Sequence, residues 1–112
     1  MIKAMSLIKR KPGLSREEFI KHYEEQHVPL AMQHFPFKKY TRNYVVSFPG
    51  TEEMNFDCVT EVWFETMEDC QAAAEFSASE AYTVISDDEE RFMDRNKIVA
   101  FLVGENTTER LD

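Results

Sequence analysis

Two segments of the chain, 56–64 and 97–103, are apolar on both sides when they are read as β-strands. Successive side chains of a strand point to opposite faces of its sheet. The two faces of 97–103 carry Ile98, Ala100 and Leu102, and Val99, Phe101 and Val103; those of 56–64 carry Val59 and Trp63, and Val62 and Phe64. A sheet built from such strands needs cover on both faces, because each Å² of apolar surface left in water forgoes about 25 cal/mol.

The order of the expected elements is that of a ferredoxin-like α+β domain. Turn signals at Pro12-Gly13 and Pro49-Gly50 end two segments rich in β-branched and aromatic residues. Helices are expected from Ser15 and from Thr66, with Ser79 capping a further helical piece. The expected strands are 2–9, 39–48, 56–64 and 97–103, with a polar loop over 51–55. The resulting order, β-α-β-β-α-β, predicts a four-stranded antiparallel sheet with its helices on one face.

Helices on one face leave the second apolar face of the sheet uncovered. Contiguous apolar patches of that size usually mark an interface. A second copy of the chain, packed sheet to sheet about a two-fold axis, would cover it. We therefore expect a homodimer in which two sheets form a dimeric α+β barrel. The domain is expected to span 1–105, followed by a polar tail over 106–112.

The start of the first helix is the strongest local signal in the sequence. Ser15 and Glu18 have the spacing of a capping box, and Leu14 and Phe19 occupy the two positions of a hydrophobic staple. Spacings of three and four then place a stripe on one helix face, namely Phe19, Tyr23, His27, Leu30 and His34. Pro29 must disturb this helix, because it lacks the N–H that would bond to the preceding turn.

Charge and composition exclude several classes of function. The net charge of −8, from 21 acidic and 13 basic residues, disfavours binding to nucleic acid and to anionic lipid. No apolar run approaches the ~20 residues that cross a bilayer, and the N-terminus lacks the features of a secretory signal. We therefore expect a cytoplasmic protein with Cys58 and Cys70 reduced. All three glycines fall in turns, so no nucleotide or flavin cofactor is expected.

His27 is the leading candidate for chemistry. Partial burial would keep its imidazole neutral near pH 7, ready to take up or release a proton. The structural alternative is that His27 bonds to a carbonyl freed by the disturbance at Pro29. His34 is expected at the surface or in a cap, and His22 in solvent, around the helix from His27. From these positions the three histidines do not converge, so no metal site is predicted.

Other polar residues leave alternatives open. Glu61 lies between apolar neighbours on its strand, so it either faces a wet cavity or pairs with a base such as Arg42 across the sheet. Asn43 could orient a substrate carbonyl, or it could satisfy a neighbouring backbone group. The acidic run 87–90 is interpreted as a solvated helix face.

Several stretches together resemble the EthD-like family. They are, in order, 7–19, His27-Val28-Pro29-Leu30, Tyr40, Asn43, Asp57, Glu61-Val62-Trp63-Phe64 and 88–94. These stretches cover nearly the whole chain, and the first two are fairly specific. One departure from the family pattern is Phe35-Pro36-Phe37, where relatives often carry a Pro-Gly turn, and it affects the expected mouth of the pocket.

The resemblance implies a dimeric α+β barrel and a pocket between sheet and helices, with His27 pointing into it. It also implies a small cofactor-independent lyase or isomerase, of the dehydratase or cyclase type, acting on an aromatic, polyketide-like or lactone substrate. On this hypothesis His27 moves a proton next to a carbonyl, while Tyr23 and Asn43 polarise the carbonyl oxygen. The expected substrate contacts are Trp63, Phe92, Glu61 and Tyr40.

Two other functions fit the same residues. One is a monooxygenase, an oxidoreductase that activates oxygen with the electron-rich ring of its own substrate. The other is a non-enzymatic ligand-binding or accessory protein of a degradation or biosynthetic pathway. All three functions require an apolar pocket with one polar group, so the sequence does not separate them.

Overall fold

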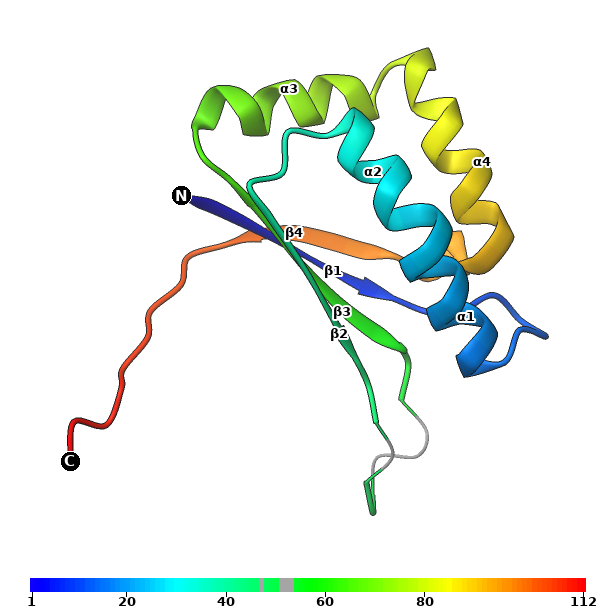
Figure 1. The fold of residues 1–112 in the computed structure, drawn as a ribbon, viewed down its shortest axis with the longest axis horizontal. Helices are drawn as coiled ribbons and strands as arrows, with labels where there is room; N and C mark the ends of the chain where they lie inside the picture. Colours follow the sequence, from blue (N-terminus) through cyan, green and yellow to red (C-terminus); the bar gives the residue numbers. More distant parts are fainter. Residues whose placement is uncertain (47, 51–53) are drawn as a thin grey trace.

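The computed structural model, which describes residues 1–46, 48–50 and 54–112, has the predicted α+β architecture (Figure 1). Its strands are β1 Ile2–Ile8, β2 Lys39–Tyr44, β3 Cys58–Phe64 and β4 Val99–Val103. They form one antiparallel sheet in the order β2-β3-β1-β4. The ferredoxin-like prediction is therefore confirmed. The predicted strand over 39–48 ends earlier, at Tyr44, and part of the predicted loop over 51–55 lies outside the described residues.

The helices pack against one face of the sheet (Figure 1). They are α1 Arg16–His22, the π-helix η1 Tyr23–His27, α2 Val28–His34, α3 Met67–Ser77, the 3₁₀ helix η2 Glu80–Tyr82, α4 Thr83–Phe92 and the 3₁₀ helix η3 Arg95–Lys97. The register pairs Ser6 of β1 with Thr60 of β3 and Ile8 with Cys58. Because side chains alternate along a strand, the even-numbered residues of β1 and β3 face the helices.

The capping box predicted at Ser15 is present. The Glu18 backbone N–H donates to the Ser15 hydroxyl at 3.1 Å, and the Ser15 backbone N–H donates to the Glu18 carboxylate at 2.9 Å. These bonds satisfy donors that the first turn of α1 leaves free. They fix the direction in which α1 leaves β1 and carries its buried face over the sheet.

Loss of this cap is expected to destabilise the whole domain. We expect Ser15→Ala to lower the free energy of unfolding by about 1 kcal/mol, because a helix-start donor loses its acceptor. Urea denaturation followed by circular dichroism measures the change. Ser77→Ala, at the exposed end of α3, is the matched control and is expected to change stability by less than about 0.5 kcal/mol. Equal stabilities for Ser15→Ala and the wild type would contradict this interpretation.

A π-helical turn joins α1 to α2 and changes the predicted stripe. The Val28 backbone N–H bonds to the Tyr23 carbonyl, five residues earlier. The turn comes just before Pro29, whose missing N–H breaks the ordinary pattern. The extra residue shifts the register, so Ala31 is buried where the stripe predicted Leu30, and His34 is exposed.

The second face of the sheet has no helix over it in the described parts of the chain (Figure 1). Val99 and Phe101 of β4 are 51% and 41% exposed on it. Beside them Lys3 pairs with Glu61 at 2.8 Å and lies over the Trp63 ring at 4.8 Å. Residues 104–112 extend away from the domain without regular secondary structure (Figure 1). None of the helices described is long and apolar enough to span a membrane.

Candidate functional site

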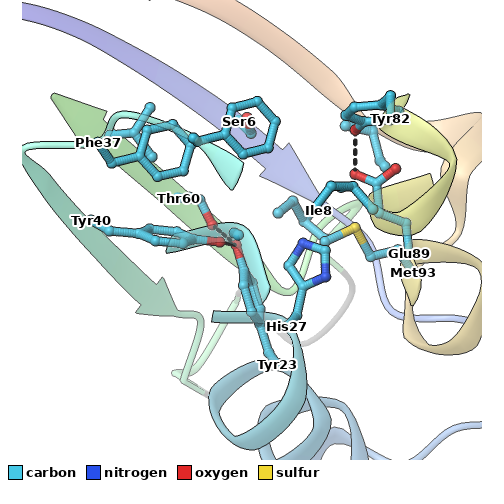
Figure 2. Close-up of a pocket in the computed structure, with 15 residues that line it drawn as sticks. Ser6, Ile8, Tyr23, His27, Phe37, Tyr40, Thr60, Tyr82, Glu89 and Met93 are labelled. Carbon is cyan, nitrogen blue, oxygen red and sulfur yellow. Dashed lines mark hydrogen bonds between the residues drawn. The ribbon is translucent and has the colours of Figure 1, made fainter. Parts of the chain in front are cut away.

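A cavity of about 140 Å³ lies between the sheet and the helices (Figure 2). Apolar side chains and tyrosine rings make up most of its lining, and seven of the lining residues bring a polar group. The polar lining residues are Ser6, Tyr23, His27, Tyr40, Thr60, Tyr82 and Glu89. An apolar cavity of about 150 Å³ takes up benzene in another protein, so this one has the size for a single ring.

His27 is held at the cavity by a buried carboxylate. Its Nδ1–H donates to Asp88 Oδ2 at 2.8 Å, and the two side chains are 5% and 7% exposed. An ionised carboxylate only accepts hydrogen bonds, so the ring hydrogen lies on Nδ1 and Nε2 is left as an acceptor. In Figure 2 the ring points into the cavity. Nε2 is therefore the nitrogen available to a ligand.

The same carboxylate binds a second histidine. His22 Nε2–H donates to Asp88 Oδ1 at 2.9 Å, and its ring stacks on Phe92 with centroids 4.8 Å apart. The predictions that His22 is solvated and lies around the helix from His27 are wrong, because the π-turn places residues five apart on one face. The prediction that 87–90 is solvated is wrong at Asp88, which is 5% exposed.

Burial and pairing set the protonation states of this group. Burial lowers the pKa of His27, and the hydrogen bond to Asp88 opposes that effect only in part. Burial alone would raise the pKa of Asp88, but the bonds from His27 and His22 outweigh it and hold that pKa below its usual value. Near neutral pH the pair is therefore a neutral imidazole on a carboxylate, which is the state of a general base. The structural alternative, a bond from His27 to a freed carbonyl, is replaced by this carboxylate.

A chain of hydroxyl groups lines the side of the cavity next to the sheet. The Tyr40 hydroxyl donates to the Tyr23 hydroxyl oxygen at 3.0 Å, and Tyr23 shares a hydrogen bond with Thr60 at 2.7 Å. Burial raises the pKa of Tyr23 and of Tyr40, so both remain protonated. Figure 2 shows these groups converging on the side of the cavity away from Tyr82. They can donate to a substrate carbonyl oxygen or to the enolate formed from it.

On the other side of the cavity stands a carboxylate that the sequence analysis missed. The Tyr82 hydroxyl donates to Glu89 Oε2 at 2.9 Å, and Arg95 Nε lies 3.3 Å from Glu89 Oε1. The Glu89 side chain is 13% exposed and lines the cavity, whereas Arg95 does not. Ile85, Asp88 and Phe92 are all buried on α4 and are spaced three and four residues apart. This spacing is the signal that could have revealed that part of the acidic run 87–90 turns toward the core.

The structure brings together only part of the predicted site. Tyr23, His27 and Tyr40 line one cavity. Phe92 is fully buried behind His27, with ring centroids 4.9 Å apart, rather than in the cavity lining. The other three predicted residues, Asn43, Glu61 and Trp63, have odd-numbered strand positions and lie on the opposite face of the sheet. They do not share a cavity with His27 within this chain.

The open alternatives for the opposite face are decided by its contacts. Glu61 pairs with Lys3 rather than with Arg42, which binds Glu24 at 2.7 Å. The Asn43 amide donates to the Val59 carbonyl at 2.9 Å, the structural role, and to Glu61 at 3.3 Å. Among the residues that the structure describes, no group of three or more His, Cys, Asp or Glu could hold a metal ion.

Comparisons with known proteins agree with this architecture. Residues 11–96 match the EthD domain family. No functionally curated protein matches the chain. An ethyl tert-butyl ether d (EthD) family protein of Bacillus halodurans is 18% identical, with a TM-score of 0.68 over 95% of this chain and 100% of its own. A protein of Arabidopsis thaliana is 20% identical, with a TM-score of 0.66 over 98% of this chain and 100% of its own.

A third similar structure comes from Thermobifida fusca. It is described as a dimeric ferredoxin-like protein of unknown function. It is 13% identical, with a TM-score of 0.56 over 93% of this chain and 90% of its own. At these identities the solved structures establish the fold alone. The family match spans most of the chain and includes the His27 motif and the Asp88 helix. The chain therefore belongs to the EthD domain family.

Proposed function

We propose that this protein is a small cofactor-independent enzyme of the lyase or isomerase type that moves a proton next to a carbonyl group of a ring-sized substrate. The observation that supports the proposal is the buried His27–Asp88 pair at the wall of an aromatic cavity, in which Nδ1 of His27 lies 2.8 Å from Oδ2 of Asp88. A buried neutral imidazole oriented by a carboxylate is the arrangement that general-base catalysis requires. Polyketide-like and lactone substrates offer such a carbonyl, and an aromatic substrate offers one where its ring carries an alkyl ketone.

The groups at the cavity can both remove and return the proton. His27 Nε2 takes a proton from the carbon next to the carbonyl, and the electron pair of that C–H bond moves toward the carbonyl oxygen. The developing oxyanion accepts a hydrogen bond from the hydroxyl chain of Tyr23, Tyr40 and Thr60. The imidazolium then returns the proton to the same or another position, while Asp88 stabilises its charge. In this proposal Tyr40 and Thr60 take the place first given to Asn43.

Exchange of carbon-bound hydrogen provides the test. Cyclohexanone in D2O loses its α-protons, and proton NMR follows the loss. We expect the wild type to accelerate exchange beyond an equal concentration of free imidazole. We expect His27→Ala to lower the protein-dependent rate by roughly 10²- to 10⁴-fold. His34→Ala is the control, because His34 is exposed and stacks on Phe76 with centroids 5.6 Å apart.

The outcomes separate the three functions. Exchange that continues at the same rate without oxygen agrees with proton transfer, whereas product formation that needs oxygen supports the monooxygenase. Ligand binding without exchange of any ring ketone supports a non-enzymatic binding protein. Full exchange by a folded His27→Ala variant would show that the assignment of His27 is wrong.

We also propose that the uncovered sheet face forms a homodimer. Support comes from the exposed apolar residues Val99 and Phe101 and from the similar fold described as dimeric. The charged groups on this face, Lys3 and Lys39 against Glu61 and Glu105, balance one another, so their burial need not leave a net charge. In this assembly Trp63, Glu61 and Asn43 line the barrel rather than the cavity.

A further inference from the structure

The charge of the cavity lining is one-sided. Glu89 brings a carboxylate to the wall, and none of the lining residues in the described chain is Lys or Arg. The guanidinium that pairs with Glu89, from Arg95, approaches from outside the lining at 3.3 Å. A ligand in the cavity therefore meets a carboxylate and neutral groups.

The one basic group in the lining does not offset this charge. His27 is neutral near pH 7, because burial lowers its pKa. Its ring is already bound to Asp88 at 2.8 Å; that carboxylate, which Arg91 also contacts at 3.3 Å, lies behind the ring and not in the lining. An anionic ligand would leave water for a cavity whose lining holds one carboxylate and no Lys or Arg, and burial of an unpaired charge is strongly unfavourable.

Glu89 nevertheless has hydrogen-bonding capacity to offer a ligand. Each carboxylate oxygen can accept two hydrogen bonds. Oε2 accepts one from Tyr82, and Oε1 faces Arg95. The remaining positions can accept from a ligand O–H or N–H. Figure 2 shows Glu89 and Tyr82 across the cavity from Tyr40 and Tyr23.

We infer that Glu89 makes the cavity select uncharged ring compounds carrying a hydroxyl or amide donor, and reject carboxylates of the same size. The donor end of the ligand binds Glu89, and an acceptor on the other side of its ring meets the hydroxyl chain of Tyr23 and Tyr40. The cavity volume of about 140 Å³ limits the ring part to a single ring. The inference rests on the proposed function only in taking this cavity as the ligand site.

Binding of matched probes tests the selectivity. We would titrate ¹⁵N-labelled wild-type protein at pH 7 with benzamide, phenol, toluene and benzoate, and follow amide shifts of the cavity residues. Benzamide and benzoate have nearly the same shape and differ in charge and in their donors. We expect benzamide and phenol to bind at the cavity at least about tenfold more tightly than benzoate, and more tightly than toluene.

A substitution at Glu89 tests the contribution of its carboxylate. Glu89→Gln removes the charge with little change in size, and we expect it to reduce the benzamide-to-benzoate ratio by about tenfold. Asp87→Asn, at an exposed position on α4, is expected to keep the wild-type ratio. If Glu89→Gln does not fold, the wild-type comparison of benzamide with benzoate still decides the question.

Two results would overturn the inference: benzoate binding at the cavity as tightly as benzamide, or probe-induced shifts confined to another surface. These are equilibrium binding results. They can fail while His27 still exchanges carbon-bound hydrogen, and exchange can fail while the selectivity holds. The inference and the proposed function are therefore distinguishable.

Discussion

Asp88→Asn is expected to remove most of the proton-exchange activity while leaving a folded protein. The carboxylate fixes the hydrogen of His27 on Nδ1 and leaves Nε2 as a base toward the cavity. An asparagine can turn its amide N–H₂ toward Nδ1, which forces the hydrogen onto Nε2 and makes it a donor. In a Ser-His-Asp triad the equivalent change lowers the rate by about 10⁴. We expect a loss on the order of 10²- to 10⁴-fold in cyclohexanone exchange.

The same substitution is expected to change stability. Three charge-assisted hydrogen bonds lose the charge of their acceptor: those from His27 at 2.8 Å, from His22 at 2.9 Å and from Arg91 at 3.3 Å. A loss of about 1–3 kcal/mol in the free energy of unfolding follows. Asp87→Asn, at an exposed position on the same helix, is the control, with an expected change below about 0.5 kcal/mol. Wild-type exchange in a folded Asp88→Asn variant would show that Asp88 does not position His27.

The pH dependence of stability has a definite sign. The folded-state pKa of His27 lies below its usual value of 6.5, so the unfolded chain binds more protons. Its contribution is present above about pH 6.5 and is lost as the pH falls through the folded pKa. The contribution of Asp88 is likewise present above its ordinary pKa of 3.8 and is lost as the pH falls through its lower folded-state pKa. In Asp88→Asn the bond that raises the pKa of His27 is gone, so NMR titration should give a still lower pKa for His27.

Phe101→Glu is expected to convert a dimer into a folded monomer. Phe101 is 41% exposed on the sheet face that has no helix over it, close to Val99 at 51%. In a sheet-to-sheet dimer a glutamate there would carry an unpaired charge into the interface, at a cost of about 3 kcal/mol or more per protomer. The two protomers together lose about 6 kcal/mol, which weakens dimerisation by about 10⁴-fold.

Light scattering measures this directly. The wild type should have twice the 13.2 kDa mass of the chain, and Phe101→Glu should have the mass of one chain at the same concentration. Met32→Glu places the same charge on α2, at a residue that is 47% exposed on the helical layer, and should remain dimeric. A wild type that is monomeric at high concentration would remove the basis for the barrel.

Much of the architecture could be predicted from the sequence because the signals are local. The Ser15 capping box involves residues three apart, and its two hydrogen bonds form as predicted. Turn signals and β-branched runs bound the strands in the same way. His27 stood out because it shares a helix stripe with the buried Phe19 and Tyr23, and all three are buried in the structure. Its catalytic role stays a prediction.

The cavity side of the sheet was harder to predict. Alternation already separates Tyr40 from Asn43, and Val62 from Glu61 and Trp63, because their numbers differ in parity. Alternation does not show whether the even-numbered or the odd-numbered residues face the helices, since both faces of the strands are apolar. Residues of η1, α2 and α4 line one cavity with Thr60 and Val62, so the even-numbered residues face the helices, and Asn43, Glu61 and Trp63 lie on the other face.

What the sequence by itself determined is the order of strands and helices, the start of the first helix and the presence of a histidine on its buried face. These follow from backbone preferences that act over a few residues. Only the tertiary structure decided that Asp88 binds His27 across 61 positions of the chain and that Glu89 faces the same cavity. Such pairings depend on how whole helices cross the sheet. The sequence of an acidic run does not by itself show which of its residues lie in water and which lie in a core.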